Sequence, residues 1–138
     1  MKTKFLKAVL FTLIIGSAIS CSKDDDNGVA AQVTNANIIL KKSNGDFANG
    51  IIVYAYDQST WDVIGDNPTF ADGQASSNSN GNAFFSNLEY PTTFNAINNN
   101  QNTFRFSAHY SLNGVNKKKV IAVTFNKGEQ KTETLILN

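Results

Sequence analysis

The stretch "NANIILKKSNGDFANGIIVYAYD", residues 35–57, decides the fold class, because apolar side chains alternate along both of its halves. Successive side chains of a β-strand point to opposite faces, so each half would present one apolar face. Asn-Gly pairs at 44–45 and 49–50 favour a tight turn between the two halves. The stretch therefore predicts two strands joined by a turn. Their apolar faces would carry Ile38, Leu40, Ile51, Val53 and Ala55.

The same pattern recurs along the rest of the chain. Residues 74–88 read as a second strand pair around an Asn-Gly turn at 80–81, and residues 103–125 alternate on both sides of Asn113-Gly114. We count six to seven strands joined by hairpin-like turns, with no helix beyond one turn near Trp61. This pattern predicts an all-β fold, an antiparallel seven-stranded β-sandwich of Ig-like architecture.

Two segments carry a resemblance to a known family. "GDFANGIIVYAYD" (45–57) and "NSNGNAFFSNLEYP" (78–91) resemble the opening of a transthyretin-like (prealbumin-like) or carboxypeptidase-regulatory-like domain. The resemblance implies the fold and no particular activity. The long insertion at 58–73 departs from it, because the family usually has a short connection there. The matching positions are Gly50, Gly81, Phe85, Leu88 and Pro91.

The sequence predicts that this protein is not an enzyme. One branch of the transthyretin-like family is a hydrolase of purine degradation that relies on several histidines, an arginine and a Tyr-Arg-Gly-Ser tail. This chain has one histidine, His109, and ends in "TETLILN". His109 lies between alternating apolar positions, so it would point to the opposite face of its strand, and no nucleophile elbow accompanies it. We predict no catalytic residues, no metal site and no cofactor.

The first twenty residues have the layout of a secretory signal. Lys2, Lys4 and Lys7 precede an apolar run at 8–15, and small residues follow. A transmembrane helix needs about 20 apolar residues, so this run is too short to span a bilayer. We predict that residues 1–20 form a signal peptide and are cleaved off.

Cys21 is the only cysteine of the chain. In an exported protein a single cysteine is a free thiol, an intermolecular bridge or a modified residue. The preceding Ala18, Ile19 and Ser20 resemble the lipobox of bacterial lipoproteins, although the family prefers leucine where Ala18 stands. The resemblance implies lipidation of Cys21, and buried acyl chains, at about 0.8 kcal/mol per methylene, would attach the protein to a membrane.

The residues after Cys21 predict where in the cell the protein is located. Ser22, Lys23, Asp24, Asp25 and Asp26 resemble the export signal of surface lipoproteins of the Bacteroidetes, which implies an outer-membrane protein that faces the cell exterior. The periplasmic face is the alternative. Charge runs extend by self-repulsion, so we interpret residues 21–32 as an acidic, flexible tether. The β-sandwich domain would then span residues 33–138.

The charge balance excludes one class of partner. After removal of the signal peptide, nine basic side chains stand against eleven acidic ones, which gives a net charge of −2. A nucleic-acid-binding domain usually carries a strongly basic surface. The only basic cluster is at 117–119, and we interpret it as the solvated start of a strand. We predict no nucleic-acid partner.

The insertion "QSTWDVIGDNPTFADG", residues 58–73, is the candidate ligand loop. An exposed tryptophan can stack on a sugar or anchor a protein, and aspartates can bind calcium. In the alternative interpretation, which we favour, Trp61, Ile64 and Phe70 fold back as a lid over one end of the sandwich. Tyr54 and Tyr56 would be aromatics of the sheet surface or a contact patch. The candidate ligand residues of the loop are Trp61, Asp62, Asp66, Phe70 and Asp72.

Two functions fit these features. The first is a non-enzymatic, lipid-anchored binding or accessory module whose partner is a glycan or an envelope protein. The second is a structural or assembly subunit of an envelope complex or surface polymer, which would associate through an exposed sheet edge. The sequence does not set the oligomeric state.

Overall fold

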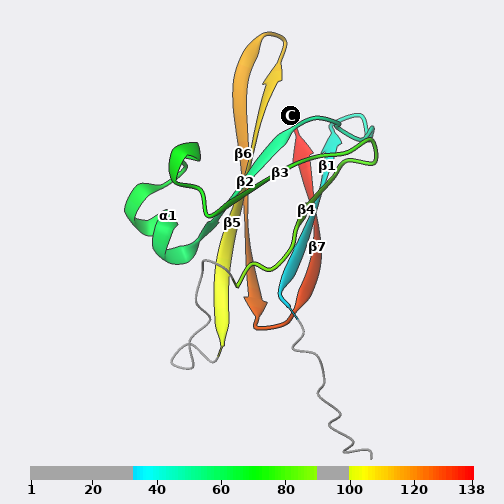
Figure 1. Cartoon of the computed structure of the whole chain (residues 1–138). Coiled ribbons are helices and arrows are strands. Elements are labelled where there is room, and N and C mark those ends of the chain that lie inside the picture. Colours follow the sequence, from blue (N-terminus) through cyan, green and yellow to red (C-terminus); the bar gives the residue numbers. More distant parts are fainter. Residues whose placement is uncertain (1–32, 90–99) are drawn as a thin grey trace, which may run out of the picture.

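The computed structural model describes residues 33–89 and 100–138 (Figure 1). The predicted signal peptide, Cys21, the segment 22–26 and Pro91 lie outside the described residues. Within the described part, seven strands form two sheets that pack face to face, which confirms the predicted all-β sandwich. The strands are β1 (Asn35–Lys42), β2 (Ile52–Asp57), β3 (Gly73–Ser76), β4 (Asn82–Phe85), β5 (Gln101–Leu112), β6 (Val115–Asn126) and β7 (Gln130–Leu137).

The two sheets have different sizes and one parallel pair. The three-stranded sheet has the order β4-β1-β7, and the four-stranded sheet has the order β3-β2-β5-β6. All neighbours are antiparallel except β1 and β7, which run parallel from Asn35 opposite Gln130 to Lys42 opposite Leu137. The prediction of a wholly antiparallel sandwich is therefore wrong for this pair.

Most of the predicted hairpins are also wrong. β1 and β2 belong to different sheets, as do β3 and β4, and β6 and β7. Gly45 and Gly50 do adopt the positive φ of tight turns, at 92° and 74°. These turns carry the chain from one sheet to the other. The apolar faces of β1 and β2 therefore both point into the core between the sheets. The exception is the predicted hairpin of β5 and β6, which turns at Asn113-Gly114 with φ of 53° and 77°.

The core lies between the sheets, and the alternation locates it correctly. Ile38, Leu40, Val53 and Ala55 are buried as predicted, whereas Ile51 is only half-buried. Aromatic rings fill the centre, with the ring centroids of Phe85 and Phe106 5.1 Å apart. Edge-to-face rings add attraction beyond the apolar area that they bury. The other central rings are those of Phe104 and Phe125.

The β5–β6 hairpin extends past the rest of the sandwich, as Figure 1 shows at the top of the view. β5 pairs with β2 only from Phe104 to His109, although its ladder with β6 runs on to Leu112 opposite Val115. We call residues 110–117 the β5–β6 arm. β1 begins at the opposite end of the molecule, so the arm points away from the start of β1 (Figure 1).

Candidate functional site

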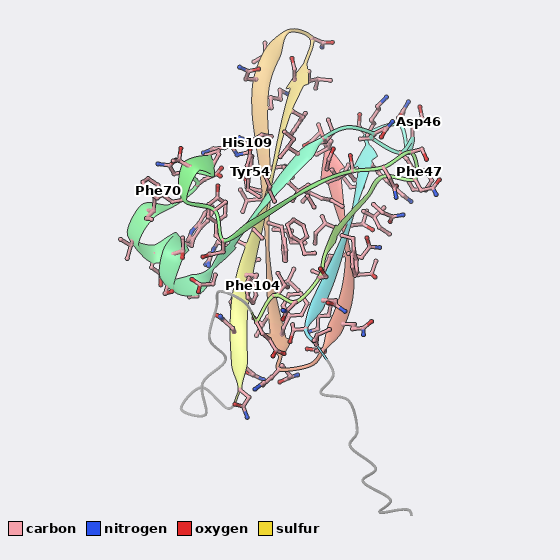
Figure 2. All side chains as sticks on the ribbon, in the orientation of Figure 1. Asp46, Phe47, Tyr54, Phe70, Phe104 and His109 are labelled. Carbon is pink, nitrogen blue, oxygen red and sulfur yellow. The ribbon has the colours of Figure 1, made fainter. Side chains whose placement is uncertain are left out.

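The candidate site lies on the outer face of the four-stranded sheet, where residues 58–72 rest on β2 and β5 (Figure 2). We call residues 58–72 the cover segment. It contains a helix, α1 (Gln58–Ile64), and a 3-10 turn, η1 (Pro68–Phe70). The helix is longer than the single turn predicted near Trp61. It begins where the Asp57 side chain accepts a hydrogen bond from the Thr60 amide at 2.7 Å, as helix caps do.

Asp72 closes the cover segment at its base. One carboxylate oxygen accepts from the Asp57 amide at 2.7 Å, and the other accepts from the Thr60 hydroxyl at 3.2 Å. The start and the end of the segment are thereby held together. Asp72 has a structural role here, which a sequence-based assignment to a ligand loop did not anticipate.

Asp66 ties the middle of the cover segment to the sheet. Its side chain is only 6% exposed. One oxygen accepts from the Tyr56 hydroxyl at 3.1 Å and lies 3.1 Å from Nε2 of His109. The other accepts from the Ser107 hydroxyl at 2.9 Å and lies 3.2 Å from Nζ of Lys118. A single carboxylate therefore connects β2, β5 and β6.

These contacts set the ionisation of the network. Burial raises the pKa of the Asp66 carboxyl, but the hydrogen bonds from Ser107, His109 and Lys118 outweigh burial and hold the pKa below its usual value. Burial, together with the charge of Asp66, raises the pKa of Tyr56 far above its usual range. Asp66 is therefore the charged member of the pair, and Tyr56 donates to it as a neutral hydroxyl.

The Trp61 side chain packs against the sheet but stays partly exposed at the surface. Its ring meets that of Tyr56 edge to face at 5.5 Å between centroids, and the Arg105 guanidinium lies 5.3 Å from its ring centroid. Arg105 also donates to the side-chain oxygen of Gln58. Tyr56 is fully buried beneath these groups, so its prediction as a sheet-surface aromatic is wrong. Trp61 remains half-buried and is not a free stacking platform.

The interpretation of this segment as a lid over one end of the sandwich is wrong about where the segment lies. The cover segment lies on the outer face of one sheet rather than over an end of the sandwich (Figure 1). Two of the three apolar residues expected to pack inward do not, since Phe70 is 55% exposed and Ile64 is exposed as well. Val63 is 84% exposed, and no residue of α1 is buried. The Asp66 and Asp72 carboxylates and the Trp61 ring hold this segment on the sheet, whereas Val63, Ile64 and Phe70 face outward.

Ser107, His109 and Asp66 do not form a catalytic triad. In such a triad the histidine lies between the serine and the acid and accepts the serine proton. Here Ser107 donates directly to Asp66 and is fully buried. His109 meets the edge of Tyr54 at 5.0 Å between ring centroids. The arrangement orders polar groups around a charge and activates no nucleophile.

The aspartates of the loop do not converge on a cation. Asp62 is exposed and accepts from Gln58 at 2.6 Å, while Asp66 and Asp72 bind separate partners. Among residues 33–89 and 100–138, no group of three or more histidines, cysteines and acids is placed to hold a metal ion. The alternative of a calcium loop has no structural support.

Sequence reasoning missed three members of the network: Tyr56, Ser107 and Lys118. Alternation places 105, 107 and 109 on the face opposite to Phe104 and Phe106, which was the available signal. It could not reveal that Asp66, far away in the sequence, covers this face.

No protein-family model matches the chain, and no curated protein matches its sequence. In the described part of the chain, no helix has the length and apolarity needed to cross a bilayer.

Proposed function

We propose that this protein is a non-enzymatic lipoprotein of the outer membrane, facing the cell exterior, whose β-sandwich binds a protein partner through the cover segment. The proposed location is supported by the lipobox-like residues 18–21 and by residues 22–26, which resemble an export signal. The resemblance at 45–57 and 78–91 supports the finer assignment of the sandwich to the transthyretin-like fold. No cofactor is part of the proposal.

One observation carries the binding function: the cover segment buries the carboxylate of Asp66 while it exposes the apolar side chains of Val63, Ile64 and Phe70. The Asp66 side chain is only 6% exposed, whereas Val63 and Phe70 are 84% and 55% exposed. A segment that served only to cover the sheet would bury its apolar side chains, because burial is what stabilises a packed element. Exposed apolar side chains on a rigid support are typical of a protein contact surface.

A protein partner fits this surface better than a glycan does. Trp61 was the candidate for stacking on a sugar ring, but Tyr56 and Arg105 already engage its ring. The exposed groups are instead aliphatic chains and one phenyl ring. The buried Ser107 hydroxyl and its direct bond to Asp66 support a function without catalysis.

The assembly function is the weaker candidate. β6 is the longest of the edge strands and would offer the most backbone for pairing between copies. It carries Lys117, Lys118 and Lys119, and charged side chains, lysine above all, are a common defence against pairing at an edge strand.

Photo-crosslinking in intact cells tests the binding surface. With p-benzoylphenylalanine in place of Val63, we expect one discrete adduct of higher mass, and we expect Phe70→Ala in the same chain to remove most of it. The matched control has the photo-reactive group in place of Phe84, which is 58% exposed on the other sheet. Adducts of equal yield from both positions, or an adduct that Phe70→Ala leaves unchanged, would contradict the proposal.

Metabolic labelling with an alkyne analogue of palmitate tests the anchor. We expect the unmodified chain to be labelled and to sediment with membranes, and Cys21→Ala to lose both properties, because the thiol is the acylation site. Ser20→Ala is the control, since alanine is also a small residue at that position. Retained labelling of Cys21→Ala would disprove the lipid assignment and leave the crosslinking result unaffected.

A further inference from the structure

The inner face of the β5–β6 arm continues the core-facing side of β5 and β6, but the three-stranded sheet does not extend over it. Cross-strand partners share a face, so Leu112 and Val115 lie on the same side as Tyr110 and its partner Lys117. β1 ends at Lys42 and β7 ends at Leu137, and neither extends over the arm (Figure 1). Leu112 is accordingly 39% exposed, and Val115 is exposed too.

A cleft of about 290 Å³ opens between the base of the arm and the β1–β2 connection. Clefts of this size with mostly apolar walls and a few polar groups are typical of small-molecule sites. Its polar rim consists of Lys42, Ser43, Asn44 and Ser111. Its apolar walls consist of Ala48, Ile51, Tyr110, Leu112 and Leu137.

The walls of the cleft are fixed before any ligand binds. The Ser77 hydroxyl is buried, donates to the Ala48 carbonyl at 2.8 Å and accepts from the Ile51 amide at 2.9 Å. On the opposite wall, the Tyr110 hydroxyl donates to the Asn138 carbonyl at 2.9 Å. A preformed cleft binds without the cost of ordering its walls.

Lys42 and Lys117 contribute positive charge beside the cleft. Lys42 lies on the rim, and Lys117 lies on the same face of the arm as Tyr110. Asp46 is the acid of the adjoining loop, and the Asn44 amide already donates to it at 2.8 Å. An apolar body with an anionic end would match both the walls and the rim.

We propose that this cleft binds a small amphiphilic anion, with its apolar chain between Ile51 and Leu112 and its carboxylate beside Lys42 and Lys117. The site is separate from the cover segment, which lies on the outer face of the sheet, and it goes beyond the function proposed above. Leu112 and Tyr110 supply the contact with the chain, and the lysines select the sign of the charge.

Two probes test the proposal: decanoate and decyltrimethylammonium, which have chains of the same length and opposite charge. In NMR titrations of the ¹⁵N-labelled protein, we expect decanoate to shift the amide signals of Ile51 and Leu112 and of the rim residues. We expect decyltrimethylammonium to bind at least about 10-fold more weakly, because like charges repel at the rim. Equal affinity for the two probes, or shifts confined to the cover segment, would overturn the proposal.

Two variants and one control locate the site. Leu112→Asp places a charge in the wall, and Lys42→Glu reverses the charge at the rim; each should weaken decanoate binding by about 10-fold. Val120→Asp is the matched control, since Val120 is 37% exposed and belongs to the opposite face of β6. It should change the affinity by less than about 2-fold. Equal losses in Leu112→Asp and Val120→Asp would refute the assignment.

Discussion

Gly81→Ala is expected to lower the free energy of unfolding by about 3 kcal/mol, because a β-carbon at this position meets backbone that cannot move aside. The added atom would lie 2.5 Å from the carbonyl oxygen of Leu40, which belongs to the buried strand β1. The Leu40 amide in turn donates to the Gly81 carbonyl at 2.8 Å. Relief of the contact would therefore break the junction between β1 and the turn before β4.

Gly50→Ala separates this contact from the effect of backbone conformation. Gly50 has a φ of 74°, close to the 73° of Gly81, but nothing lies within 4 Å of its added β-carbon. It should cost only about 1 kcal/mol, the price of a left-handed alanine. Urea unfolding of both variants measures the difference. Equal destabilisation would mean that the close approach of β1 and the turn is not present in solution.

Asp66→Ala is expected to cost about 2 to 3 kcal/mol, because it leaves a buried network without its acceptor. Ser107 is fully buried and would lose the partner of its hydroxyl, and Tyr56 would lose its own. Asp62→Ala is the control in the same segment: Asp62 is exposed and should contribute less than about 0.5 kcal/mol. If both variants unfold at the same urea concentration, Asp66 does not hold the cover segment.

The Asp66 contribution should depend on pH in a defined direction. The pKa of Asp66 is lower in the folded protein than its usual value, so the folded state favours the carboxylate. The resulting stability is present above the unfolded pKa of about 3.9 and is lost as the pH falls through the folded pKa. The difference between the unmodified protein and Asp66→Ala should thus shrink below about pH 4. A difference that stays constant down to about pH 2 would contradict the charged network.

The sequence predicted which side chains are buried better than it predicted which strands pair. Alternation is a local property of each strand, and it correctly placed Leu40, Val53 and Phe106 in the core. A turn signal tells where the chain reverses but not whether the next strand joins the same sheet. The parallel pairing of β1 with β7 connects the two ends of the domain and leaves no local signal.

Only part of the candidate site was predictable from the sequence, because contacts between distant residues leave no local signal. Residues 58–73 stood out as an insertion with Trp61, Asp66 and Phe70. The inward orientation of Asp66 depends on partners such as Ser107, and the two residues become neighbours only in the folded chain.

The parallel pair also bears on when the protein can fold. β1 is the central strand of its sheet, and it needs β7 from the far end of the domain as well as β4. Pairings between distant parts of a chain form slowly, because a large loop must close before any contact is gained. The three-stranded sheet therefore cannot be completed until β7 is available.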